Sequence, residues 1–192
     1  MSANAETLTP NQTARRNRVL DAAMALAAEG GYDAVQMRDV AARAEVALGT
    51  IYRYFSSKDH LLAACQVELW KAVADRFGQR PPEGRMPADR VLSVLGSAMR
   101  AAEREPRRTA ALVTATSSAD PAVHDCQSEI MEIMGRVLSD AMGAEVDADR
   151  RARIALTLRQ VWFAWLLCWV NGWDDAATVN AELESATRLL LD

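Results

Sequence analysis

The sequence predicts an all-α protein with a small N-terminal helical head and a larger C-terminal helical body. Its composition is rich in alanine and poor in strand-forming residues, and apolar residues recur three and four positions apart along most of the chain. Both features favour helices. Of the 192 residues, 50% are apolar and 25% are charged, which is the balance of a globular protein with a substantial core.

Breaks in this spacing divide the N-terminal third into four predicted helices. The first ends at Gly30 and Gly31, because paired glycines favour the C-cap of a helix. Two short helices follow, joined by a tight turn at residues 45–47, and Ser56 or Ser57 caps the fourth helix. The four helices are expected over residues 13–29, 37–44, 48–55 and 58–77.

Five further helices are expected in the body. Residues 78–87, GQRPPEGRMP, separate them from the preceding helix because proline and glycine do not propagate a helix. Pro106 breaks the first two, and Asp120 followed by Pro121 combines a capping side chain with proline at the first helical position. These helices are expected over residues 88–105, 107–118, 121–142, 147–171 and 176–191.

The net charge of −4 excludes a uniformly basic protein, so DNA binding requires a local basic surface. The head offers seven cations for it: Arg15, Arg16, Arg18, Arg38, Arg43, Arg53 and Lys58. The first three of these either contact phosphates or remain solvated.

Cysteine usage and hydropathy bear on the compartment. The three cysteines are far apart and form no CxxC pair, which is typical of reduced thiols in a cytoplasmic protein. The most apolar stretch, residues 161–170, is about half the ~20 residues that a membrane span requires, so no membrane partner is expected.

Residues 37–55 have the pattern of a helix-turn-helix, in which two short helices cross and a third braces them. The crossing requires small or apolar side chains, and Ala41, Ala44, Val46 and Ile51 occupy it. The second short helix, LGTIYRYF, presents side chains suited to the phosphates and bases of a major groove. Its two tyrosines are two positions apart and cannot share one helix face, so at least one is partly exposed.

The run from Met37 to Leu62, MRDVAARAEVALGTIYRYFSSKDHLL, resembles the signature of the TetR family, in which GTIYxYFxSK forms the recognition helix and its exit. The resemblance implies a three-helix DNA-binding head over residues 13–60 and a ligand-binding and dimerisation domain over residues 61–192. It also implies a homodimer, formed through the last two helices, on a palindromic operator in double-stranded DNA. Residues 1–12 are expected to form a disordered arm.

By this resemblance, the DNA-contacting surface is centred on the second short helix. Tyr52, Tyr54 and Lys58 are expected at backbone phosphates, and the other residues of the helix face bases, while Phe55 anchors the helix in the core. The full predicted set is Gln36, Arg38, Ala47, Leu48, Gly49, Thr50, Tyr52, Arg53, Tyr54 and Lys58.

Three positions depart from the broad family pattern. Met37 stands where Thr or Ser caps the first short helix, Glu45 replaces the turn glycine, and Ala47 replaces the Ser that caps the recognition helix. A lost cap commonly costs ~1 kcal/mol. An acidic residue near phosphates weakens non-specific binding to DNA.

A narrower resemblance extends further. Residues 26–62 are similar to the actinobacterial repressors of cholesterol and steroid catabolism, and residues 162–170, WFAWLLCWV, have the character of that group's penultimate helix. This implies a ligand-responsive repressor whose effector is a steroid-derived acyl-CoA thioester. Two alternative functions of a DNA-binding protein stay open: a drug-responsive regulator of an efflux pump, and a protein without an effector. A third alternative, from another class of protein, is a helical acyl-CoA-binding protein without DNA function.

Trp162, Trp165, Trp169 and Trp173 follow spacings of three and four, which places all four on one helix face. They belong to a pocket for a flat apolar molecule, to the dimer interface or to ordinary core. Methionines in the body either add adaptable surface for a large hydrophobic effector or simply fill space. The predicted pocket residues are Leu95, Met99, Leu112, Met131, Met134, Trp162, Trp165, Leu166 and Trp169.

The remaining polar residues carry weaker hypotheses. Arg107 and Arg108 either begin a solvated helix or attract an anionic group such as a coenzyme A phosphate, and Arg159 is a candidate to pair with a carboxylate across an interface. His124 and Cys126 lack a convincing third ligand, so no metal site is expected. No activated nucleophile and no glycine-rich phosphate loop is present, so neither an enzyme nor a cofactor is predicted.

Overall fold

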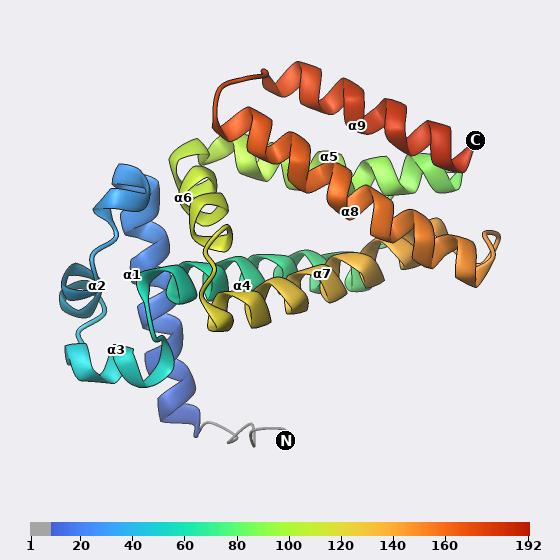
Figure 1. Cartoon of the computed structure of the whole chain (residues 1–192). Coiled ribbons are helices and arrows are strands. Elements are labelled where there is room, and N and C mark those ends of the chain that lie inside the picture. The colour runs from blue at the N-terminus through green and yellow to red at the C-terminus, as the bar shows by residue number, and fades with distance from the viewer. Residues whose placement is uncertain (1–8) are drawn as a thin grey trace.

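A computed structural model describes residues 9–192, and within that range it contains nine helices and no strand (Figure 1). The predicted all-α architecture is confirmed, and each predicted helix lies within about one turn of an observed one. The helices are α1 (Pro10–Ala34), α2 (Met37–Arg43), α3 (Leu48–Tyr54), α4 (Lys58–Gln79), α5 (Pro87–Arg104), α6 (Pro106–Thr116), α7 (Pro121–Met142), α8 (Ala148–Val170) and α9 (Ala176–Leu191).

Helix α1 begins earlier than predicted. The Thr9 hydroxyl accepts a hydrogen bond from the Gln12 N–H at 3.3 Å, and the Gln12 side chain accepts one from the Thr9 N–H at 2.7 Å. This capping box starts the helix at Pro10, so residues 10–12 are helical and the prediction of a disordered arm over residues 1–12 is wrong for them. The rest of the predicted arm, residues 1–8, lies outside the described residues.

The other end of α1 is interrupted as the paired glycines predict. Gly31 has φ of 74°, a left-handed conformation that breaks the helix before a last short turn reaches Ala34. Helices α2 and α3 pack against the preceding part of α1 and complete the head (Figure 1). Val40, Ile51 and Phe55 form its centre, with at most 2% of each side chain exposed.

The body is built from the remaining helices. Helices α4 and α7 lie side by side, and α8, α9 and α5 cover the region farthest from the head (Figure 1). Helix α6 packs along α1 of the head and also against α4, so it stands between the head and the body. No helix within residues 9–192 combines the length and the apolar character needed to cross a membrane.

A capping interaction ties the start of α4 to the body. Ser57 caps α4 by accepting a hydrogen bond from the His60 N–H at 3.0 Å, and its hydroxyl donates to Asp120 at 2.8 Å. Asp120 in turn caps α7 by accepting from the Ala122 N–H at 2.9 Å. These two donors, the Ala122 amide first, hold the pKa of Asp120 below its usual value. The exit of the recognition helix is therefore fixed to the first turn of α7.

Candidate DNA interface and cavity

The recognition helix α3 has one buried and one exposed side. Ile51 is fully buried, whereas Tyr52 is 53% exposed and Arg53 is also exposed. A Cβ atom added at Gly49 would meet no other atom within 4 Å, so the backbone there is open to a close approach. Tyr54 is half-buried and packs against the core, which makes Tyr52 the more accessible tyrosine.

Phe55 sets the orientation of α3. The ring is buried, as predicted, between the Arg16 guanidinium carbon, 5.7 Å from the ring centroid, and the edge of the His60 ring, 5.5 Å away. Arg16 is held in turn by Glu68 of α4 at 3.2 Å. Because α1 and α4 both contact this ring, the exposed side of α3 has a defined direction.

Lys58 is held at the start of α4. Its Nζ donates to the Tyr32 carbonyl oxygen at 3.2 Å and lies 3.6 Å from the Tyr32 ring centroid. The Tyr32 hydroxyl donates to Asp59 at 2.5 Å. Partial burial, followed by Asp59, raises the pKa of Tyr32 to about 12, so the hydroxyl stays protonated. The predicted contact of Lys58 with a phosphate remains a prediction.

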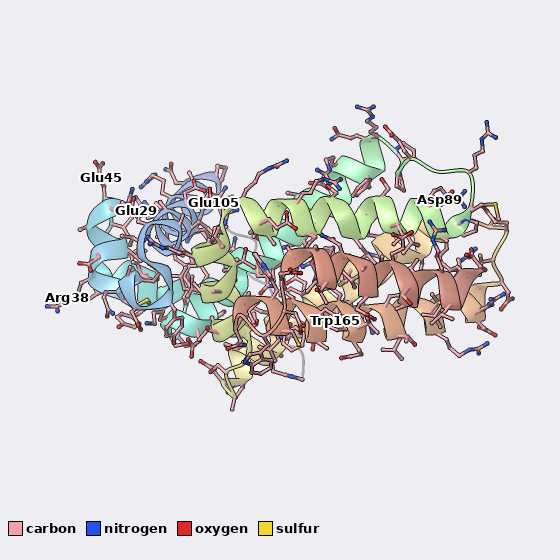
Figure 2. The ribbon with its side chains drawn as sticks, turned by 90° about the horizontal axis from the view of Figure 1, so that it is seen from above. Glu29, Arg38, Glu45, Asp89, Glu105 and Trp165 are labelled. Atoms are coloured by element: carbon pink, nitrogen blue, oxygen red, sulfur yellow. The ribbon has the colours of Figure 1, made fainter. Side chains whose placement is uncertain are left out.

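The seven cations of the head differ in their partners. Arg18 donates to the Ala44 carbonyl oxygen at 3.2 Å, and Arg43 forms a two-bond pair with Glu29 at 2.6 and 2.8 Å. Arg15, Arg38 and Arg53 are exposed and have no ion pair or hydrogen bond from their side chains within residues 9–192. Arg38 lies at the outer end of the head in Figure 2. These three arginines are therefore the cations most available to DNA.

The three departures from the family pattern have structural consequences. The cap position of α2 is Gln36 and not Met37 as predicted, because Met37 is already the first helical residue. Neither α2 nor α3 has a side-chain cap, because Gln36 and Ala47 at the N-cap positions supply no cap hydrogen bond. Glu45 has φ of 53° and is the one described non-glycine residue with a positive φ. An L-residue in this left-handed conformation is strained, which explains why glycine suits the turn.

The body contains an apolar cavity of about 130 Å³ between four helices. Helix α4 forms one wall, α5 and α8 form others, and α6 closes the cavity on the side toward the head. Trp70 and Trp162 meet edge to face with their ring centroids 6.3 Å apart. The lining residues are Gln66, Leu69, Trp70, Val73, Ala98, Ala101, Ala102, Arg108, Thr109, Leu112, Trp162 and Leu166.

The structure brings only part of the predicted pocket together. Leu112, Trp162 and Leu166 line the cavity, whereas Leu95, Met99 and Met134 are buried in the core away from it. Met131 instead borders a separate, more open pocket of about 720 Å³ between α6, α7 and α8. Trp165, labelled on α8 in Figure 2, and Trp169 are half-buried beside the core.

One tryptophan of the predicted stripe is not on the helix. Because α8 ends at Val170, Trp173 lies in the following turn and is 68% exposed, so the prediction that all four share one face is wrong. Gln66, Trp70 and the whole α5 wall of the cavity were not predicted. The polar Gln66 within the apolar run LLAACQV was the available signal for α4.

Arg107 and Arg159 of the body each donate a hydrogen bond to a backbone carbonyl oxygen of another helix, and their predicted roles toward a ligand or an interface stay predictions. Arg107 Nη1 donates to the Glu29 carbonyl oxygen at 2.8 Å, at the end of α1. Arg159 Nη1 donates to the Met131 carbonyl oxygen at 2.6 Å within the same chain. Neither forms an ion pair with a carboxylate within residues 9–192.

Two family models match the chain. Residues 19–65 match the model for bacterial regulatory proteins of the tetR family, and residues 84–190 match the tetracyclin repressor-like C-terminal domain. The chain belongs to the TetR family. It is therefore a DNA-binding transcriptional regulator and not an enzyme, as the helix-turn-helix predicts.

Individual proteins similar to this TetR-family regulator are also transcriptional regulators. It is 38% identical over 180 residues to the HTH-type transcriptional repressor KstR of Rhodococcus jostii, covering 94% of this chain and 84% of that protein. A TetR transcriptional regulator from Rhodococcus sp. RHA1 superposes with a TM-score of 0.85 at 34% identity, covering 94% of this chain and 97% of that one. The Thermus thermophilus repressor FadR, solved in complex with lauroyl-CoA, shares the fold with a TM-score of 0.74 at 21% identity, over 91% and 92% of the two chains.

The strained turn gives a prediction that separates conformation from charge. Glu45→Gly removes both the left-handed strain and the negative charge, whereas Glu45→Ala removes only the charge. We expect the glycine variant to be more stable than the alanine variant by about 1 kcal/mol in urea unfolding. Both variants should bind a non-operator duplex more tightly than the wild type in fluorescence anisotropy. Equal stabilities would show that the turn is unstrained, and unchanged affinities would place Glu45 away from the phosphates.

Proposed function

We propose that this TetR-family repressor controls genes of steroid or cholesterol catabolism and leaves its operator when a steroid-derived acyl-CoA thioester binds the cavity. Similarity to KstR along 94% of the chain supports this assignment. So does the resemblance of residues 26–62 to the repressors of cholesterol catabolism. The structural observation that most strongly supports the proposal is an apolar cavity lined by two tryptophans. It lies beside α6, the helix that contacts the head.

The size of the cavity indicates how an effector would act. Ligand pockets usually enclose ~300–1,000 Å³, and this cavity has about 130 Å³. A steroid or a long acyl chain therefore fits only if the surrounding helices separate. Trp70 and Trp162 contact each other in the cavity wall, so their separation would be part of this widening.

Helix α6 is the element through which widening would reach the head. It lines the cavity with Arg108, Thr109 and Leu112, and Arg107 on its other side donates to the Glu29 carbonyl oxygen of α1. The Glu29 carboxylate then pairs with Arg43 of α2. A shift of α6 would move the end of α1 and, with it, α2. The effector needs only to favour the shifted state, because allosteric coupling equals its difference in affinity between the two states.

On DNA, the exposed side of α3 would enter the major groove. The exposed Tyr52 would bind a phosphate, and the open backbone at Gly49 would allow close approach to the groove wall. A two-fold dimer would present two such helices ~35 Å apart, one turn of DNA, so the operator would be a near-palindrome.

The dimer would form through α8 and α9, which lie along one side of the body (Figure 1). Leu156 of α8 and Leu189 of α9 are 50% and 84% exposed. Large apolar side chains left in water on adjacent helices favour burial against a second copy. This arrangement leaves the recognition helix of each subunit free.

The function is tested by fluorescence anisotropy of a labelled duplex from the region upstream of the gene. We expect tight binding that a steroid acyl-CoA thioester releases, while a fatty acyl-CoA and a free steroid leave it unchanged. Release by the fatty acyl-CoA, or by other lipophiles alone, would contradict the steroid assignment. Tyr52→Ala should lower operator affinity about tenfold, as loss of a hydrogen bond to a charged phosphate predicts, while the protein remains dimeric. Loss of the dimer in this variant would remove Tyr52 from the DNA interface.

The dimer interface is tested by a matched pair of substitutions. Leu156→Lys should weaken dimerisation at least about tenfold, because it places a charge at the centre of the apolar interface. Met86→Lys changes a side chain of similar exposure, 57% against 50%, in the α4–α5 connection and should leave the dimer intact. Sedimentation equilibrium measures both. Equal behaviour of the two variants would rule out the α8–α9 interface.

A further inference from the structure

The wall of the cavity contains two polar atoms that lack partners. Gln66 Oε1 on α4 and Arg108 Nε on α6 are buried, and neither forms a hydrogen bond in the part of the chain that the structure describes. Both residues line the same cavity, whose wall is otherwise mostly apolar. A buried polar group without a partner costs ~1–3 kcal/mol, and more if it is charged. Such groups are rare in folded proteins, and a pair at one cavity indicates a missing binding partner.

The polar side chains next to Arg108 on α6 do have hydrogen-bond partners. The Thr109 hydroxyl, next along α6, donates to the Ala102 and Glu105 carbonyl oxygens, each at 3.1 Å. Arg107, the preceding residue, donates to the Glu29 carbonyl oxygen. The start of α6 therefore satisfies its other polar side chains, and the unsatisfied one is the arginine that faces the cavity.

Arg108 also lacks a counter-ion. No carboxylate within residues 9–192 forms an ion pair with it, although most ion pairs of this chain involve arginine. Arg159 offers a comparison, because its Nε is likewise unsatisfied but its Nη1 donates to a carbonyl oxygen and it does not line the cavity. Arg108 thus combines an unpaired charge, a free donor and a position on the cavity wall.

We propose that Arg108 binds the acyl oxygen of the effector, with its Nε donating to a thioester carbonyl or a free carboxylate. Gln66 lies on the facing helix and accepts a hydrogen bond from a hydroxyl donor on the same ligand. This assignment rests on the proposed function in one respect, that the cavity is the effector pocket. The residues of the cavity wall determine this chemistry, because a guanidinium with a buried Nε forms its strongest hydrogen bonds with charged or strongly polar oxygens. The apolar remainder of the cavity accepts the hydrocarbon body.

This proposal is tested with ligands that differ by one oxygen. A steroid acyl-CoA thioester has a carbonyl that the matching steroid alkyl-CoA thioether lacks, and a fatty acyl-CoA and its thioether form a second pair. The free steroid acid distinguishes a carboxylate from a thioester as the group recognised. Binding is followed without DNA through the change in tryptophan fluorescence, to which Trp70 and Trp162 in the cavity wall contribute.

We expect the wild type to bind the thioester about 10- to 100-fold more tightly than the thioether, as a charge-assisted hydrogen bond predicts. Arg108→Met should abolish this preference and leave thioether binding and operator affinity unchanged. Arg107→Met, at the adjacent position outside the cavity, should keep the preference. Gln66→Leu should lower the affinity for hydroxylated steroid ligands and leave the affinity for ligands without a hydroxyl group unchanged.

A preference that persists in Arg108→Met would overturn the proposal. The same holds if the wild type does not discriminate thioester from thioether in either pair, a result that needs no variant to fold. A preference seen with the fatty pair but no binding of the steroid pair would support Arg108 and refute the steroid assignment. Steroid thioester release from the operator without any carbonyl preference would retain the proposed function and refute the role of Arg108.

Discussion

Helix α6 lies against α1 of the head with one side and closes the cavity with the other, and this double packing constrains the rest of the molecule. The Arg107 side chain donates to the backbone at the end of α1, so α6 is attached to the head by a specific bond as well as by apolar contact. Protein interiors are close-packed and have little free volume. A ligand larger than the cavity therefore displaces α6 or the helices that it touches unless it extends out of the cavity opening.

The head responds to such a displacement because its own internal support is modest. Many of its buried side chains are small alanines, both short helices lack side-chain caps, and Glu45 stores strain in the turn between them. A missing cap commonly weakens a helix by ~1 kcal/mol. The position of α2 and α3 thus depends strongly on α1 and α4, which both contact Phe55 or its neighbours.

The charges of the molecule also limit how the head binds DNA. The net charge is −4, and several head arginines are occupied by internal partners. Affinity for DNA then depends on few exposed cations and on the shape of the recognition helix. Binding to DNA that relies on phosphate contacts falls as salt rises, and a small number of such contacts limits binding to non-operator sequences.

The sequence predicted the helices well because proline, glycine and capping residues mark their ends locally. Asp120 before Pro121 and Ser57 before Lys58 begin helices where they were expected. The cap at Thr9 was overlooked because its partner Gln12 lies before the first apolar residue of the helix.

The cavity was harder to predict because its walls depend on how four helices cross, which no local pattern encodes. Met99 and Leu112 have similar apolar character, yet one is buried in the core and the other faces the cavity. Trp70 was not among the predicted pocket residues because it is an isolated tryptophan in α4, away from the tryptophan-rich segment of α8. Packing between helices that are far apart in the sequence therefore determines which of the predicted residues line the cavity.

We propose that the cavity and the DNA-binding head belong to one conformational equilibrium. Isothermal titration calorimetry tests this by measuring the affinity for the releasing acyl-CoA thioester of the free protein and of the protein bound to its operator. Thermodynamic linkage requires the operator to lower effector affinity by the same factor by which the effector lowers operator affinity. We expect the operator-bound protein to bind the thioester more weakly than the free protein. Equal effector affinity of the two forms would show that the cavity and the head are not coupled.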